Sequence, residues 1–272
     1  MQENSVGIIG CGWLGMNLAK SLLSEGVKVL GSTTQASRLN QLKDANIESY
    51  LLKITPEGAQ GTIDPFLKCS TLVIGIPPKL RAEESSPYLS KIDRLVEMLK
   101  SYSGQLVFLS STGIYNDQQG LCREDLPVQS PLKRVQNLAL AEDKIRTHFP
   151  SSVVFRLGGL LGSDRHPIYR LAGKLLLNPD SKINCIHISD VIAAIQLCRH
   201  LRLAGETYNL VSPHHPKKGA YYPKIAKLMN LDPPKFGEQV EKIRIVDHSK
   251  FCEQTGFIYS VQDLYQLGIA PK

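Results

Sequence analysis

The sequence predicts an α/β protein with a mainly parallel sheet. Short apolar segments, typical of buried strands, alternate with longer segments of helical periodicity. The first strand-to-helix turn carries three closely spaced glycines, as in proteins that bind a phosphate group at a helix N-terminus. The chain has 272 residues, 42% hydrophobic and 21% charged, which suits one large domain or a domain with a smaller lobe.

The expected elements follow one another in a regular order up to residue 158. The expected strands are 5–10, 27–31, 47–52, 70–76, 105–110 and 152–157, and the expected helices are 13–24, 36–44, 87–101 and 132–148. The order then becomes less regular: strands at 183–187 and 207–211 flank a helix at 190–202. We therefore expect a nucleotide-binding domain over 1–160, completed by about 183–211, and a small lobe from 161–182 and 212–272.

Composition argues against several classes of protein. The net charge is +7, but lysines and arginines recur singly, without a basic stripe interleaved with aromatic residues. An anionic small molecule is therefore a better expected ligand than nucleic acid. We expect no signal peptide, no membrane span and a cytoplasmic location. The six cysteines are scattered without a CxxC pair, so we expect reduced thiols and no metal site.

The glycine turn fits the spacing GxGxxG. Gly10 would allow the tight turn, Gly12 the close approach of a pyrophosphate, and Gly15 the close packing of helix on strand. The position after a first strand and before a helix is the context that this motif requires. The alternative is a glycine turn kept for packing alone.

The segment after the second expected strand indicates which dinucleotide would bind. NAD-binding chains usually place a carboxylate there for the ribose 2′-hydroxyl, but LGSTTQASR, residues 30–38, has none. The side chains that could surround a 2′-phosphate instead are Ser32, Thr33, Thr34 and Arg38. This favours NADP(H), with NAD as the alternative. In the opposing interpretation, Ser37 caps the next helix and Arg38 is solvated.

Three later segments narrow the family. LSSTGIY (109–115), FRLGGLLG (155–162) and IHISDV (186–191) resemble the SSxxxY, RxxxxxG and HxxDV segments of extended short-chain dehydrogenases/reductases. GCGWLGM (10–16), SSTGIY, RHP (165–167), ETYNLVSPHHP (206–216) and DPPKF (232–236) look more closely like the YeeZ-like atypical extended members. The resemblance covers nearly the whole chain.

The resemblance implies a Rossmann fold, that is, a doubly wound parallel sheet of about seven strands, with a small C-terminal substrate lobe. It also implies a small-molecule substrate and a homodimer formed through the helices at 87–101 and 132–148. The cofactor contacts that it implies are Gly10, Gly12, Trp13, Leu14, Ile76, Pro77 and Leu109. Ser111 would bind the substrate hydroxyl or carbonyl, and Leu157 and Gly158 would lie near the nicotinamide.

The chain departs from the family at its usual acid/base pair, YxxxK. Our alignment places Arg134 at the tyrosine position and Leu138 at the lysine position. Tyr115 could substitute, with Lys133 or Arg134 lowering its pKa, and Tyr169 is a second candidate.

The histidines admit simpler interpretations. We expect His187 to fix a turn with Asp190 at the start of a helix. The pair His214-His215 could face a substrate cleft, although a solvated loop is the simpler expectation.

Three functions remain open from the sequence. The first is an NADP(H)-dependent oxidoreductase or epimerase acting on a small polar or sugar-like substrate, and the second is an NADP(H)-sensing protein without turnover. The third is a β-hydroxyacid-type dehydrogenase, which would need a long all-helical C-terminal domain. The strand signals after Gly158 argue against such a domain.

Overall fold

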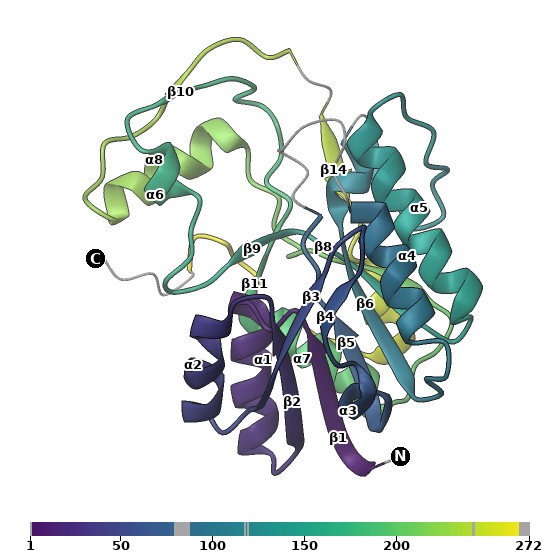
Figure 1. The fold of residues 1–272 in the computed structure, drawn as a ribbon. Coiled ribbons are helices and arrows are strands. Elements are labelled where there is room, and N and C mark those ends of the chain that lie inside the picture. The colour runs from purple at the N-terminus through teal and green to yellow at the C-terminus, as the bar shows by residue number, and fades with distance from the viewer. Residues whose placement is uncertain (1, 79–87, 117, 119, 241–242, 267–272) are drawn as a thin grey trace. The chain divides into compact units, whose positions relative to one another are not determined.

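The computed structural model describes residues 2–78, 88–116, 118, 120–240 and 243–266 (Figure 1). The chain forms two compact units. The first consists of Met1–Ser110, Gln129–Phe155 and Ile195–Thr207, and the second of Ser111–Val128, Arg156–Ala194 and Tyr208–Lys272. The division into a cofactor domain and a substrate lobe, with its boundary near residue 160, stays a prediction.

The largest sheet has eight strands in the order β12-β8-β6-β5-β1-β2-β3-β4. They are β1 Gln2–Ile9, β2 Lys28–Thr33, β3 Glu48–Ile54, β4 Ala59–Gly61, β5 Cys69–Ile74, β6 Gln105–Ser111, β8 Val153–Leu157 and β12 Thr207–Leu210. β1 pairs in parallel with β2 and β5, β2 with β3, and β5 with β6, whereas the short edge strand β4 is antiparallel to β3. The predicted doubly wound parallel sheet is confirmed.

The strand order reverses at β1. From β1 the chain adds β2 and β3 on one side, and later β5 and β6 on the other. In open parallel sheets of this kind, ligands bind beyond the carboxyl ends of the strands at the point of reversal. The glycine turn follows β1 directly and so lies at that point.

Six helical segments of the described residues lie wholly in the first unit. They are α1 Trp13–Ser24, η1 Ala36–Arg38, α2 Leu39–Asp44, α3 Asp64–Leu67, α4 Tyr88–Met98 and α5 Lys133–His148. α1 has the predicted bounds. Leu18 and Leu22 lie on its buried face, and Gly26, at φ 74°, adopts the left-handed conformation that ends the helix. The predicted start of the third helix, Pro87, lies outside the described residues.

Helices α4 and α5 pack against each other (Figure 1). Val135, Leu138 and Ile145 form the buried side of α5, and Lys144 forms an ion pair with Asp93 of α4. Leu138, at the family's lysine position in our alignment, is therefore a core residue. The dimer through these helices stays a prediction.

The second unit is built from short elements. Its strands are β7 Gly120–Cys122, β9 Gly159–Leu161, β10 Leu175–Leu176, β11 Cys185–His187, β13 Lys235–Phe236 and β14 Arg244–Val246, and its helices are η2 Thr112–Tyr115, α6 Ile168–Leu171, α8 Lys218–Leu228 and α9 Ser249–Thr255. Helix α7 Ile188–His200 begins in the second unit and ends in the first. The strands pair in parallel as β9 with β11, β10 with β13, and β7 with β14. The expected strand at 183–187 and helix at 190–202 correspond to β11 and α7.

Apolar side chains from β9, β11, α6 and α8 gather in the second unit. This C-terminal apolar cluster consists of Leu161, Ile168, Ile183, Cys185, Tyr221, Tyr222, Ile225, Ala226, Met229 and Leu264. Burial of these side chains stabilises the second unit. Among the described residues, no helix is both long and apolar enough to cross a membrane.

Candidate cofactor site and the polar network around Tyr115

The glycine turn closes tightly onto its neighbouring strands. Gly10 has φ 90°, and a Cβ there would lie 2.7 Å from the carbonyl oxygen of Gly75. Gly12 donates its N–H to the Gly10 oxygen at 2.7 Å, and Cys11 donates to the Ser32 oxygen at 2.8 Å. The first glycine is thus required by the backbone itself, as the motif predicts.

The presence of glycine at positions 12 and 15 has a different explanation at each position. A Cβ on Gly15 would lie 3.0 Å from Ile8 Cγ2, so Gly15 permits the close packing of α1 on β1. Among the described residues, a Cβ on Gly12 would meet no atom nearer than the Gly10 oxygen at 3.9 Å. Packing within this part of the chain therefore does not require the second glycine. Gly12 is the N-cap of α1, where backbone N–H groups and the helix dipole favour an anion.

Two of the predicted hydroxyls lie at the end of β2 and accept backbone N–H groups. Ser32 Oγ accepts the Gly10 N–H at 2.9 Å, and Thr33 Oγ1 accepts the Gln35 N–H at 3.2 Å. Both side chains are buried, whereas Thr34 is exposed. Among the three predicted hydroxyls, Thr34 is therefore the one whose exposure suits a phosphate contact.

Arg38 lies close to the glycine turn. Its charge lowers the pKa of the Cys11 thiol, although burial has the larger effect and raises that pKa to about 11. Its Nε donates to Gln41 Oε1 at 3.3 Å. Ser37 lies inside η1, and the N-cap of that segment is Gln35, so the predicted alternative of a Ser37 cap is wrong.

The end of β5 lies beside the end of β1. Gly75 donates its N–H to the Ile9 oxygen at 2.8 Å, and a Cβ on Gly75 would be 3.6 Å from Leu109 Cδ1. The half-buried Ile76 and the exposed Pro77 follow Gly75 directly. The predicted cofactor residues of the first unit therefore gather at one edge of the sheet, around the glycine turn.

Leu157 and Gly158 belong to the second unit. The carbonyl oxygen of Leu157, a buried residue, accepts from Thr112 Oγ1 at 3.3 Å. A Cβ on Gly158 would lie 2.8 Å from both the Asn184 oxygen and Val211 Cγ1. Packing therefore explains Gly158, and the predicted nicotinamide contact of both residues stays a prediction.

Ser111 is the N-cap of η2. Its Oγ accepts the Gly113 N–H at 3.1 Å, and the side chain is partly exposed. An oxygen that accepts in this way keeps its own O–H to donate, which suits the predicted contact with a substrate oxygen. Tyr169 lies on α6 and packs against the C-terminal apolar cluster.

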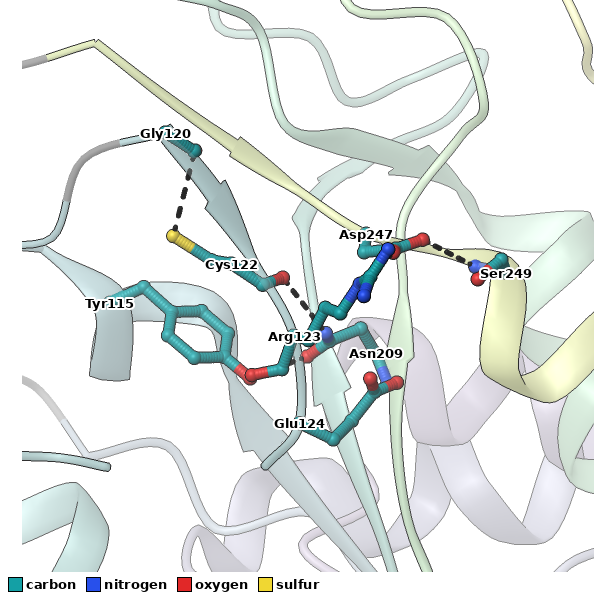
Figure 2. A network of polar contacts seen from close by, with 8 residues as sticks. All are labelled: Tyr115, Gly120, Cys122, Arg123, Glu124, Asn209, Asp247 and Ser249. Atoms are coloured by element: carbon teal, nitrogen blue, oxygen red, sulfur yellow. Dashed lines mark hydrogen bonds and ion pairs between the residues drawn. The ribbon is translucent and has the colours of Figure 1, made fainter. Parts of the chain in front are cut away.

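Tyr115 is fully buried in a polar network of the second unit (Figure 2). Its hydroxyl oxygen lies 3.0 Å from the Arg123 carbonyl oxygen and 3.1 Å from Asn209 Oδ1, which are both acceptors. It accepts a hydrogen bond from Arg156 Nη1 at 2.6 Å. Burial raises the pKa of Tyr115 to about 12, although the Arg156 cation lowers it.

These contacts favour a structural role for Tyr115. The cation that contacts the phenol is Arg156, where the sequence suggested Lys133 or Arg134. A phenol with a raised pKa and full burial is a poor proton donor to a substrate at neutral pH. The catalytic role of Tyr115 stays a prediction, and its test is given below.

The same network extends to Glu124 and to the segment at the start of α9 (Figure 2). Glu124 Oε1 accepts the Asn209 N–H at 2.7 Å, and burial raises the pKa of Glu124. Arg123 Nε forms an ion pair with Asp247 Oδ2 at 2.9 Å, and Asp247 Oδ1 accepts the Ser249 N–H at the start of α9. These partners come from segments that are far apart in the chain, so no local pattern of residues predicts the network.

The start of α7 differs from its prediction. His187 Nδ1 lies 2.7 Å from Ser189 Oγ and accepts the Ser189 N–H at 3.3 Å. Asp190 instead accepts the Ser260 N–H at 2.7 Å. Ser189, and not Asp190, is therefore the hydrogen-bond partner with which His187 fixes the turn.

Comparison with known proteins identifies the family to which the chain belongs. No family model matches the chain. The curated Protein YeeZ from Escherichia coli (strain K12) is 34% identical over 264 residues, which cover 95% of this chain and 96% of that protein. The chain belongs to the YeeZ-like group. The family predicted from the motifs is thus confirmed.

Solved structures show that this YeeZ-like chain shares its fold with epimerases. MoeE5 in complex with UDP-glucuronic acid and NAD superposes with a TM-score of 0.80 at 18% identity, covering 97% of this chain and 96% of that one. UDP-glucuronic acid 4-epimerase from Bacillus cereus, in complex with UDP-glucuronic acid and NAD, gives 0.80 at 14% identity with the same coverage. A functionally unknown conserved protein from Silicibacter pomeroyi DSS gives 0.79 at 18% identity, again with 97% and 96% coverage.

Proposed function

We propose that the protein is an NADP(H)-binding, atypical extended short-chain dehydrogenase/reductase. It acts as an oxidoreductase or epimerase on a small polar or sugar-like substrate. The observation that carries this proposal is Gly12, the N-cap of a twelve-residue helix, where packing among the described residues does not require a glycine. A residue without a side chain at a helix N-terminus allows a pyrophosphate to approach the backbone closely.

The choice of NADP(H) over NAD rests on the segment after β2. Residues 30–38 contain no carboxylate to accept from a ribose 2′-hydroxyl. Thr34 is exposed, and Arg38 lies close enough to the turn for its charge to act on Cys11. An arginine beside the ribose is the usual partner of a 2′-phosphate. Two of the solved relatives hold NAD, so NAD is the competing cofactor.

A bound nicotinamide dinucleotide would accept or donate hydride. Residues of this chain would bind the cofactor: the N-terminus of α1 would bind the pyrophosphate, and Arg38 would bind the 2′-phosphate. Ser111 would donate its O–H to the reacting oxygen and hold it in place.

The chain lacks the usual residues for transferring a proton to or from the reacting oxygen. Leu138 is fully buried and apolar, and Arg134 is exposed, with a guanidinium that stays protonated. A serine hydroxyl alone is too weak an acid to complete the transfer. General acid–base catalysis contributes a factor of about 10²–10⁴, so its loss would make turnover of ordinary substrates slow.

Calorimetric titration with NADPH and NADH tests the proposal. We expect the wild type to bind NADPH more tightly than NADH. Arg38→Ala should weaken NADPH binding by about 1.5–3 kcal/mol, typical of a charge-assisted hydrogen bond, and leave NADH binding nearly unchanged. Arg94→Ala, which removes an exposed arginine of α4, is the matched control and should change neither affinity.

Two results would count against the proposal. Failure of the folded wild type to bind either dinucleotide would remove the cofactor altogether. Equal losses of NADPH and NADH affinity in Arg38→Ala would show that Arg38 supports the fold and that no 2′-phosphate is recognised there.

A second function, NADP(H) sensing without turnover, is favoured by the locked position of Tyr115. Its hydroxyl is engaged by Arg156 and faces two acceptors, so no phenol is offered to a substrate. A sensor would change its hydrogen-exchange pattern on binding NADPH but convert no carbonyl compound. The third candidate, a β-hydroxyacid-type dehydrogenase, is disfavoured because β9 to β14 follow residue 158, where that class needs helices.

A further inference from the structure

The segment after β12 is paired with the segment that leads into β11, within the second unit. Ser212 donates its N–H to the Cys185 oxygen at 2.8 Å, and Ile183 donates to the Pro216 oxygen at 2.9 Å. The segment that carries the two adjacent histidines is therefore held by its backbone, where a solvated loop was the simpler expectation. Its side chains are thus kept close to the start of β11.

His215 has one ring nitrogen bound and the other without a partner. Nδ1 lies 3.1 Å from the Ile183 carbonyl oxygen, which can only accept, so Nδ1 carries the proton and donates it. In the neutral ring Nε2 then carries the lone pair. Nε2 is buried and has no hydrogen-bond partner among the described residues. Buried polar atoms are normally paired in folded proteins, so this nitrogen needs a donor from outside that part of the chain.

The groups that act on His215 by their charge are all basic. They are His248, His214 and Lys182. Burial, the largest cause, lowers the pKa of His215, the hydrogen bond to Ile183 opposes this, and the three basic neighbours lower the pKa further. His215 therefore keeps its lone pair at neutral pH, and the basic groups around it attract a negative charge to the same place.

Lys182 and His248 lie near enough to share a ligand with His215. The ring centres of the two histidines are 6.4 Å apart, and the charge of Lys182 reaches His215. Lys217 is paired with Asp180 at 2.8 Å, whereas no carboxylate of the described residues pairs with Lys182. The described part of the chain also contains no group of three or more side chains that could hold a metal ion. These basic groups therefore favour an anion.

We propose that His215, Lys182 and His248 bind a hydroxylated anion, that is, a small molecule with a hydroxyl group beside a carboxylate or phosphate. The hydroxyl donates to His215 Nε2, and the negative group lies against Lys182 and His248. This inference rests on the proposed function in taking that molecule to be the substrate. It narrows the small polar or sugar-like class to its acidic members.

Titration of the full chain with three probes at neutral pH tests the site, with the ring signals of labelled histidines followed by NMR. D-Gluconate has both groups, D-glucose has hydroxyls without a charge, and acetate has a charge without a hydroxyl. We expect gluconate to shift the His215 and His248 signals saturably. It should bind about three- to tenfold more tightly than either of the other probes, because each of those lacks one of the two contacts.

Three variants assign the contacts. His215→Phe removes both ring nitrogens and should weaken the binding of gluconate and of glucose. Lys182→Met removes a charge and should weaken gluconate about tenfold, with glucose unchanged. Lys235→Met, at an exposed lysine of β13, is the matched control and should bind all three probes like the wild type. The affinity for NADPH should be the same in all of these proteins.

Three outcomes would overturn the proposal. The first is the absence of saturable shifts at both histidines up to high millimolar gluconate. The second is unchanged gluconate affinity in His215→Phe or in Lys182→Met, which for His215 would mean that water alone satisfies Nε2. The third is equal affinity for gluconate and acetate, which would mean a purely ionic contact.

Calorimetric titration of the same samples with NADPH separates this site from the cofactor. A protein that binds NADPH but not gluconate would contradict the site alone. A protein that binds gluconate but not NADPH would support the site and contradict the proposed function.

Discussion

Replacing Gly12 with alanine separates cofactor binding from folding. The Cβ of the variant would lie 3.9 Å from the nearest described atom, the Gly10 oxygen, and Gly12 has a negative φ of −83°. We therefore expect a loss of only about 0.5–1 kcal/mol in unfolding free energy, as for a poorer N-cap residue. The methyl group would, however, occupy the space through which a pyrophosphate reaches the backbone. Losing one hydrogen bond to a charged phosphate costs about 1.5–3 kcal/mol, or about 10- to 150-fold in affinity.

Two other glycines give the comparison its controls. Gly10→Ala forces a side chain into φ 90° and within 2.7 Å of the Gly75 oxygen. It should lose about 2 kcal/mol or more of stability, because left-handed backbone alone costs roughly 1–2 kcal/mol. Gly58→Ala adds a methyl group in open space and should change neither stability nor binding.

The assay combines urea unfolding with calorimetric titration of NADPH for each variant. The result that would refute the reasoning is a Gly12→Ala protein that binds NADPH as tightly as the wild type. The pyrophosphate would then not approach the backbone at this turn, and Gly12 would need another explanation.

The remaining predictions concern the second unit and turnover. Tyr115→Phe should lose about 1–3 kcal/mol of stability in urea unfolding, because its polar partners are buried, and should keep its NADPH affinity; if a substrate is found, a rate loss above about a hundredfold would instead identify Tyr115 as the acid. Common nucleotide sugars and simple carbonyl compounds should show no appreciable turnover in an NADPH absorbance assay, and brisk turnover would mean that Arg134 does not occupy the tyrosine position. Burial raises the pKa of Asp247, but hydrogen bonds from Ser249 and Arg123 outweigh it and the pKa is lowered. The stability from this carboxylate is thus present at neutral pH and lost as pH falls through the acid range. Asp247→Asn should therefore be less stable than the wild type at pH 7, and its unfolding free energy should fall less than that of the wild type between pH 7 and pH 3. An unchanged pH dependence would contradict the assignment.

Much of the first unit was predictable because its signals are local. Helix α1 has the predicted bounds, since the glycine turn fixes its start and Gly26 its end within a few residues. The parallel strands are buried apolar runs, which stand out in a sequence. The same reasoning predicted the tight turn at Gly10 and the close packing at Gly15 without knowledge of any distant contact.

The second unit was less predictable because its order depends on distant partners. Helix α8 contains Pro223, a residue that usually argues against a helix interior, so no helix was expected there. Strands β7 and β14, of three residues each, pair across more than a hundred positions. Ser32 was expected at the 2′-phosphate, but its hydroxyl accepts the Gly10 N–H, a contact that only the fold reveals.

The emission of Trp13 tests the central claim most directly. This residue is the sole tryptophan, begins α1 and lies within the glycine turn. A dinucleotide bound there would pass close to the indole, so NADPH should quench its emission saturably, with energy transfer to the dihydronicotinamide. We predict that this quenching follows the affinity measured by calorimetry and is weakened in Gly12→Ala. A flat titration up to millimolar NADPH, with the protein folded, would contradict the account.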